Sequence, residues 1–169
     1  RLQAGPLQRI VLTHGHPDHI GGLKRILHSN PVLTYAHRLE IPYIEGDLPY
    51  RQGKKPVAYM HKGIVQALGE DEHGRLQSIG SLVPFHTPGH SPGHVVFFHE
   101  KDRVLLAGDL FYSKNGKLRP PLFTENTEET VRSSSIVSLL RPARVEICHG
   151  KPIFNAADQI GDYILKYLR

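Results

Sequence analysis

The chain has 169 residues, of which 39% are hydrophobic and 22% are charged, and its formal net charge is +5. That length is enough for one domain with a buried core, and no apolar run reaches the roughly 18 to 20 residues of a membrane-spanning helix. The single cysteine, Cys148, excludes an intrachain disulfide and favours a reducing, cytoplasmic setting.

Charge distribution and the chain start set further expectations. Basic and acidic side chains are interspersed, so the positive charge favours anionic substrates but does not indicate nucleic acid. The chain begins at Arg1 and its only methionine is Met60, so we expect the translation start, and any signal peptide, to lie upstream. No composition shift or repeat interrupts the sequence, and residues 1–169 are therefore predicted to form a single domain.

The first predicted strand is the apolar, β-branched run Arg9–Thr13, and a cluster of polar side chains follows it directly. The segment His14–His19 holds three imidazoles and one carboxylate, which are side chains that zinc and neighbouring first-row metals prefer. Side chains two residues apart on extended backbone project to the same side, so His14 and His16 can bind one ion.

A helix is expected to begin at Pro17 and to run towards Asn30, because apolar residues recur there at helical spacing. Asp18 and His19 then lie at the helix start and face differently from the first histidine pair. The run Val32–Ala36 is predicted to be a second strand, and the order strand, helix, strand indicates a βαβ unit.

The segment Glu40–His73 is rich in proline, glycine and tyrosine, and only Gly63–Leu68 indicates a helical turn. A long irregular segment inside a compact domain is typical of a functional loop. Its tyrosines, Tyr43, Tyr50 and Tyr59, either line a pocket or attach the loop to the body of the domain.

Further strands are predicted to lead into further ligand-type side chains. A hairpin is expected around Ser78–Ser81, and the strand Val83–His86 leads into a turn that ends in His90.

The clearest hairpin joins Val95–His99 to Val104–Ala107, and its second strand leads into Asp109. A later strand, Arg144–Cys148, leads into His149 in the same way.

Two helices are expected in the same half of the chain. The first begins at Asn126 or Thr127, which suit a helix cap, and runs to about Leu140. The second is a closing amphipathic helix over Asn155–Arg169.

Four separate strands are therefore expected to end in candidate metal ligands. A lone histidine after a strand is usually an ordinary loop or packed residue, but seven ligand-type side chains at four strand ends together indicate a metal site. These residues are His14, His16, Asp18, His19, His90, Asp109 and His149.

The same residues resemble the signature of the metallo-β-lactamase-fold hydrolase superfamily, and within it the glyoxalase II and lactonase branch. The match comprises T-H-x-H-x-D-H at Thr13–His19, T-P-G-H at Thr87–His90, G-D at Gly108–Asp109 and H-G at His149–Gly150. The resemblance implies an α/β protein with a four-layer αβ/βα sandwich. Members begin with several strands before the first motif, so we expect a sandwich truncated at its N-terminus and completed by a missing segment or a second chain.

The resemblance also implies two divalent metal ions, with zinc expected first and iron or manganese as alternatives. It divides the seven candidate ligands into two sets of three and one bridging residue: His14, His16 and His90; Asp18, His19 and His149; and Asp109. A metal-bridging hydroxide would be the nucleophile, and Asp18 would orient it.

The predicted function is hydrolysis of a small-molecule ester, thioester or lactone, in a pocket formed partly by the loop Ile41–Lys62. Two alternatives stay open. One is a nucleic-acid phosphodiesterase of the same fold, which the pI near 9.4 favours, and the other is an inactive metal-binding fragment. No membrane partner is expected.

Several side chains near the motifs have two interpretations. Tyr112 matches a tyrosine of the lactone-hydrolysing members and either donates to a developing oxyanion or packs in the core. His86 and His94 either orient the ligands or have only solvent and packing roles. Cys148 is expected to be buried, because neighbours on a strand point to opposite faces and His149 is expected to face the metal.

Overall fold

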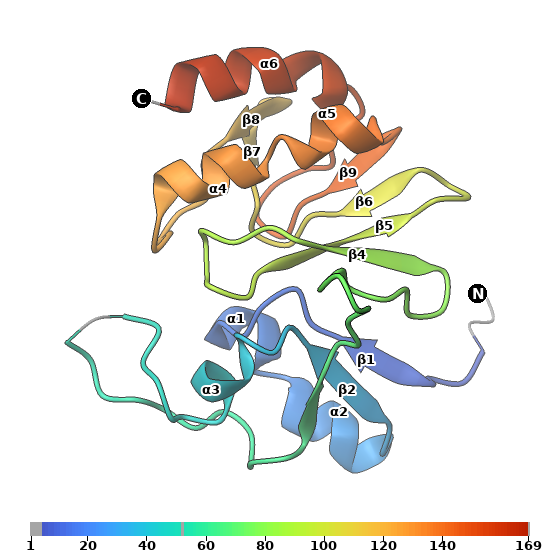
Figure 1. The fold of residues 1–169 in the computed structure, drawn as a ribbon, viewed down its shortest axis with the longest axis vertical. Helices are drawn as coiled ribbons and strands as arrows, with labels where there is room; N and C mark the ends of the chain where they lie inside the picture. The colour runs from blue at the N-terminus through green and yellow to red at the C-terminus, as the bar shows by residue number, and fades with distance from the viewer. Residues whose placement is uncertain (1–4, 52, 169) are drawn as a thin grey trace. The chain divides into compact units, whose positions relative to one another are not determined.

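The computed structural model describes residues 5–51 and 53–168. The ends of the predicted single domain, 1–4 and Arg169, and the loop residue Gln52 lie outside the described residues. The chain divides into two compact units, Arg1–Leu68 and Gly69–Arg169 (Figure 1). Among the described residues, no helix combines the length and the apolar character needed to cross a membrane.

A three-stranded parallel sheet organises the first unit. Its strands are β1 (Arg9–Val11), β2 (Leu33–Ala36) and β3 (Val65–Ala67), in the order β1-β2-β3. The first two strands and their βαβ connection confirm the prediction. The predicted helical turn over Gly63–Leu68 is wrong, since part of that segment pairs with β2 and buries Val65. Pairing with a neighbouring strand decides the conformation of so short a segment.

The helix predicted from Pro17 is two helices, α1 (Pro17–Ile20) and α2 (Leu23–Ser29). They are separated by Gly21 and Gly22, residues of low helix propensity. A third helix, α3 (Ile41–Ile44), lies in the segment predicted to be irregular. Four residues are too few to show helical periodicity in a sequence. Side chains of these helices pack with the sheet into one hydrophobic core, which includes Ile20, Leu23, Ile44, Met60 and Val65.

A buried carboxylate holds the loop that carries the first histidines. Glu40 is fully buried, and its Oε2 accepts hydrogen bonds from the Gly15 backbone N–H at 3.0 Å and the Tyr50 hydroxyl at 2.6 Å. Burial, together with the nearby Glu40 carboxylate, raises the pKa of the Tyr50 hydroxyl, which therefore stays protonated and donates. A Cβ at position 15 would lie 2.1 Å from the Tyr50 oxygen, so only glycine fits.

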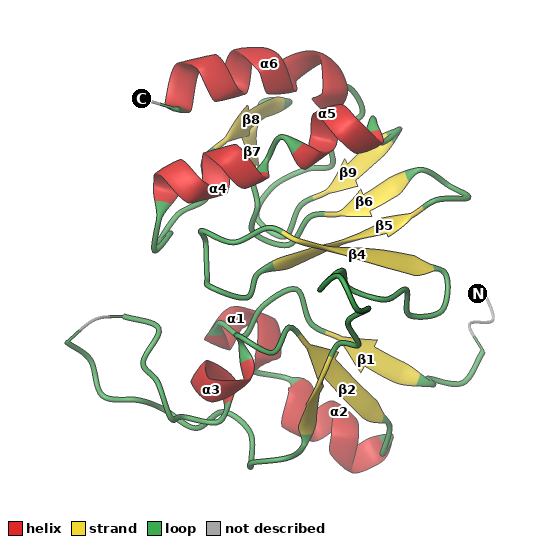
Figure 2. Cartoon of the chain, viewed as in Figure 1, coloured by secondary structure: helices red, strands yellow, loops and turns green. Residues whose placement is uncertain are grey.

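The second unit contains a four-stranded sheet with the order β4-β5-β6-β9 (Figure 2). Its antiparallel strands are β4 (Leu82–His86), β5 (Val95–His99) and β6 (Val104–Leu106), and β9 (Arg144–Glu146) runs parallel to β6. These four strands confirm the prediction. The hairpin expected around Ser78–Ser81 is reduced to a tight turn with one bridge between Ile79 and Leu82.

Helices α4 (Thr127–Ser133), α5 (Ile136–Leu140) and α6 (Ala156–Tyr167) cover one face of this sheet (Figure 1). Asn126 caps α4, as predicted, by accepting a hydrogen bond from the Glu129 N–H at 3.0 Å. The single helix predicted to reach Leu140 is interrupted between α4 and α5 by a pair of serines, residues of lower helix propensity.

The structure adds a short hairpin that the sequence interpretation missed. Strands β7 (Tyr112–Lys114) and β8 (Lys117–Arg119) pair around Asn115 and Gly116, which both have positive φ. Asn-Gly with positive φ at both positions is the preferred two-residue hairpin turn, so this dipeptide was the available signal.

We expect Glu40→Gln to lower the free energy of unfolding by about 2 kcal/mol, because an amide cannot accept both hydrogen bonds as strongly as the carboxylate does. Urea unfolding followed by circular dichroism measures the change. Glu72→Gln is the matched control, since Glu72 is 86% exposed and should change stability by less than about 0.5 kcal/mol. Equal effects of the two substitutions would show that Glu40 does not stabilise the loop.

Candidate functional site

Each of the four strands predicted to carry ligands ends shortly before them. In the first unit, β1 leads into the segment His14–His19. In the second unit, β4 precedes the turn with His90, β6 precedes Asp109 and β9 precedes His149. The candidate ligands therefore form two clusters, one in each unit.

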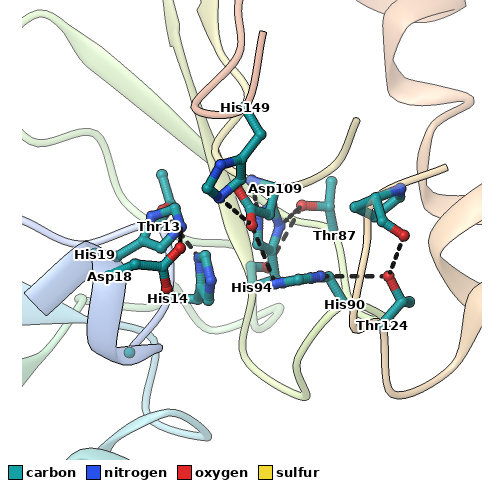
Figure 3. Close-up of polar contacts among 12 residues, drawn as sticks. Thr13, His14, Asp18, His19, Thr87, His90, His94, Asp109, Thr124 and His149 are labelled. Atoms are coloured by element: carbon teal, nitrogen blue, oxygen red, sulfur yellow. Dashed lines mark hydrogen bonds and ion pairs between the residues drawn. The ribbon is translucent and has the colours of Figure 1, made fainter. Parts of the chain in front are cut away.

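The cluster of the first unit brings its three imidazoles together, and Figure 3 shows two of them, His14 and His19, near Asp18. The buried His14 ring has its centroid 4.7 Å from that of His16 and 4.0 Å from that of His19. Asp18 lies on the same turn, with Oδ2 3.6 Å from His19 Nε2 and its side chain 58% exposed. The closeness of His14 and His16 agrees with the alternation expected of extended backbone.

Two neighbours orient these rings. The Thr13 hydroxyl lies 3.2 Å from His14 Nδ1, so one nitrogen of this ring has a hydrogen-bond partner within the loop. The His16 ring packs edge-on against Tyr50, with centroids 4.5 Å apart. Since Tyr50 also donates to Glu40, the same buried network holds the backbone at Gly15 and one face of the His16 ring.

In the second unit, two histidines converge on one carboxylate oxygen (Figure 3). Oδ2 of the buried Asp109 lies 3.5 Å from His90 Nε2 and 3.3 Å from His149 Nε2. The His149 side chain is 50% exposed, whereas the Asp109 side chain is only 6% exposed.

The His90 ring is oriented by Thr124. The Thr124 hydroxyl lies 3.1 Å from the Pro121 carbonyl oxygen, to which it donates, and 3.4 Å from His90 Nδ1. Thr124 Oγ1 can then accept from a protonated Nδ1, which leaves a lone pair on Nε2, the nitrogen that faces Asp109.

The backbone of the His90 turn is attached to the start of α4. The Glu125 N–H donates to the His90 carbonyl at 3.3 Å, and the Asn126 N–H donates to the Gly89 carbonyl at 2.8 Å. Gly89 has φ of 127°, and a Cβ there would lie 2.2 Å from the Thr130 backbone nitrogen. Only glycine therefore permits this approach.

His94 orients Asp109, one of the two roles left open by its sequence context. Its ring is fully buried, and Nε2 accepts a hydrogen bond from the Asp109 backbone N–H at 3.1 Å. Because Nε2 accepts, the neutral ring carries its proton on Nδ1, which donates to the Thr87 hydroxyl at 2.9 Å. His86 differs, since its exposed ring contacts the Pro92 carbonyl.

The chemistry of these donors fits a divalent metal. In the second unit, His90 Nε2 with its lone pair and Asp109 Oδ2 are both electron-pair donors, and they face each other at 3.5 Å. Such a pair is stable only when a cation, either a proton or a metal ion, lies between or beside the two atoms. Imidazole with carboxylate is a ligand set that zinc, iron and manganese accept.

Tyr112 is half-buried at the start of β7, where it bridges to the backbone of His149, and both interpretations of this residue stay open. The prediction that Cys148 is buried is wrong: the residue is exposed. Burial alternates from Val145 to Cys148, and this alternation ends at His149, which is exposed beside the exposed Cys148.

The loop tyrosines line a cavity. Tyr43, Tyr50 and Tyr59 lie in its wall, and Tyr50 and Tyr59 also attach the loop to the unit through Glu40 and the hydrophobic core, so both interpretations of these residues hold. Glu40 is the functional residue that sequence reasoning missed. A glutamate before a proline-containing turn gives no local sign of burial, and only the folded structure brings it to Gly15.

Comparison with known proteins gives a family. The model of the metallo-beta-lactamase superfamily matches residues 1–149. The probable metallo-hydrolase YybB of Bacillus subtilis (strain 168) is 37% identical over 168 residues, which are 98% of this chain and 74% of that protein. A hydroxyacylglutathione hydrolase of Francisella tularensis subsp. novicida (strain U112) is 33% identical over 107 residues, 63% of this chain and only 35% of that protein.

Solved structures agree with the sequence relatives. The crystal structure of TTHA1623 in a di-iron-bound form has a TM-score of 0.66 and 28% identity, and the match covers 89% of this chain and 73% of that one. The B3 metallo-beta-lactamase BLEG-1 has a TM-score of 0.66 and 27% identity over the same shares of the two chains. These findings confirm the predicted fold and enzyme class. The chain belongs to the metallo-beta-lactamase superfamily, and it is a metallo-hydrolase of that fold.

Proposed function

We propose that the chain is a dinuclear metal-dependent hydrolase of a small-molecule ester, thioester or lactone. The observation that supports it best is the convergence of two histidine nitrogens on the single buried oxygen Oδ2 of Asp109. A carboxylate with ligands on two sides is suited to a bridging role between two ions. The proposed ligand sets are His14, His16 and His90 for one ion, and Asp18, His19 and His149 for the other.

Two divalent ions, when bound, would lower the pKa of a water molecule and polarise the carbonyl under attack. The residues of the chain supply the geometry for that chemistry. His94 and Thr87 fix the backbone at Asp109, and Thr124 fixes the tautomer of His90. Glu40 fixes the loop between His14 and His16.

Two side chains are proposed to act on the reacting atoms. Asp18 is a partly exposed carboxylate that accepts a proton or hydrogen bond from the attacking water. Tyr112, half-buried beside His149, donates its hydroxyl hydrogen to the oxygen that becomes negative as the acyl group is attacked.

The substrate class rests on the relatives. Hydroxyacylglutathione hydrolases are thioester hydrolases by name. This chain matches about a third to a half of the length of two such relatives. Zinc is the proposed metal, and the neighbour solved in a di-iron-bound form keeps iron as the second choice. The scarcity of cysteine supports a cytoplasmic location.

Metal analysis tests the proposal directly. The purified chain should contain about two equivalents of divalent metal, and dialysis against a chelator should abolish hydrolysis of an ester, thioester and lactone panel until metal is restored. Asp109→Asn should lower the metal content, while His28→Ala, at an exposed histidine of α2, should leave it unchanged. Full turnover by the metal-free protein would overturn the proposal, and cleavage of bis-p-nitrophenyl phosphate alone would favour a phosphodiesterase.

Asp18→Asn should lower kcat by at least about 100-fold, because the amide cannot accept a proton from the attacking water. Steady-state kinetics on the best ester of the panel measure the change. Asp158→Asn, at a carboxylate in the first turn of α6, is the matched control. Near-normal turnover of the Asp18 variant would remove this residue from the mechanism.

Tyr112→Phe should lower kcat by about 100-fold and change KM little, because the lost hydroxyl interacts only with the developing charge. Tyr35→Phe on β2 removes a hydroxyl of the same kind and should leave both constants unchanged. An intact rate in the Tyr112 variant would assign this residue a packing role.

A further inference from the structure

The loop between α3 and β3 forms a cavity of about 250 Å³ in the first unit. Its wall combines tyrosines and aliphatic side chains with basic residues. The lining residues are Pro17, Tyr43, Leu48, Pro49, Tyr50, Arg51, Lys54, Lys55, Val57 and Tyr59. Ligand pockets have this character: mostly hydrophobic and aromatic, with a few polar groups that fix orientation.

The aromatic side of the cavity is held in place. Tyr43 and Tyr50 stack with centroids 4.8 Å apart and ring planes 25° from parallel. Tyr50 is fixed in turn by its hydrogen bond to the buried Glu40. A flat, preformed surface of this kind binds an alkyl or aryl group at low entropic cost.

The charged side of the cavity carries one sign only. Arg51, Lys54 and Lys55 are exposed, and the lining contains no carboxylate. The acidic residues nearby in sequence bind elsewhere, since Asp47 pairs with Lys62 at 2.6 Å and Glu45 accepts from a backbone N–H at 2.7 Å. Among the described residues no carboxylate forms an ion pair with these three cations, and three such cations at the edge of an apolar wall favour a ligand with an anionic end.

The cavity adjoins the ligand cluster of the first unit. Pro17, which lines it, lies in the sequence between His16 and Asp18, and Tyr50, which also lines it, packs against the His16 ring. A molecule in the cavity therefore lies beside the residues proposed to bind metal. The remaining part of the same molecule can extend from the tyrosines towards those residues.

We propose that this cavity binds the non-reacting end of the substrate, and that this end is a hydrophobic segment carrying a carboxylate. The hydrophobic segment lies on Tyr43 and Tyr50, and the carboxylate lies among Arg51, Lys54 and Lys55. This inference rests on the proposed hydrolase function, because only that function makes the molecule bound in the cavity a substrate. It narrows the proposed substrate class to small esters or thioesters with an anionic end.

The first test is binding to the full purified chain by isothermal titration calorimetry, with 4-phenylbutyrate as the anionic probe and 4-phenylbutan-1-ol as its neutral counterpart. The acid should bind about 10-fold more tightly than the alcohol, and the difference should shrink at high salt. Equal affinities for the two probes would overturn the proposal.

A pair of double variants locates the binding. Lys54→Gln/Lys55→Gln should weaken phenylbutyrate binding about 5-fold, because each exposed charge contributes a modest attraction. Lys24→Gln/Arg25→Gln removes the same charge from the exposed face of α2, in the same unit, and should weaken binding less than about 2-fold. Equal weakening in both double variants would show that net charge, not the cavity, attracts the acid.

Val57 provides a test inside the cavity. Its side chain is 54% exposed, so a polar substitution there should leave the fold intact. Val57→Asp should weaken phenylbutyrate binding at least about 10-fold, while Val57→Asn, of similar shape, should weaken it less. Equal effects of the two substitutions would contradict a carboxylate in the cavity.

A kinetic comparison separates this inference from the hydrolase proposal. Mono-p-nitrophenyl glutarate should have a kcat/KM about 10-fold above that of p-nitrophenyl butyrate, and the lysine double variant should remove the preference. Hydrolysis of both esters with no preference would overturn the anionic cavity and leave the hydrolase proposal standing. Phenylbutyrate binding that depends on Lys54 and Lys55, without hydrolysis of any ester, would overturn the hydrolase proposal and leave the anionic cavity standing.

Discussion

The rest of the first unit's site depends on the buried carboxylate of Glu40. One oxygen of this group accepts from the backbone between two histidines and from a tyrosine that packs on one of them. A loop cannot hold metal ligands in register unless its own backbone is fixed, and here a charge-assisted pair of hydrogen bonds does so. In the second unit, His94 has the same structural role as Glu40, because it accepts a hydrogen bond from the backbone of Asp109 and so fixes it.

Much of this arrangement could be predicted from the sequence. Short apolar, β-branched runs located β1, β2, β4, β5, β6 and β9, and the ligand-type residues at four strand ends located both clusters. Strand ends are predictable because hydrophobic runs stop where polar side chains begin. The tyrosine-rich loop left two interpretations open, and both hold, since Tyr43, Tyr50 and Tyr59 line the cavity and Tyr50 also attaches the loop to Glu40.

What the sequence did not predict depends on contacts between distant residues. Strand β3 owes its conformation to pairing with β2, and Cys148 and His149 are both exposed after the end of β9, so the opposite faces expected of them do not occur. The roles of Glu40 and His94 follow from burial, and a single sequence gives no measure of which polar residue will be buried. The hairpin of β7 and β8 is different: its Asn-Gly turn was readable, but its two strands are short and partly charged, so no hydrophobic pattern accompanied it.

The close approach of Gly89 to α4 joins a ligand turn to a helix. The carbonyls of Gly89 and His90 accept the amide hydrogens of Asn126 and Glu125, so the turn and the helix start cannot separate without breaking both bonds. The exchange rates of these two amide protons therefore report on the stability of the His90 turn itself. A spectroscopist could follow a ligand loop by observing the beginning of a helix about 36 residues further along the chain.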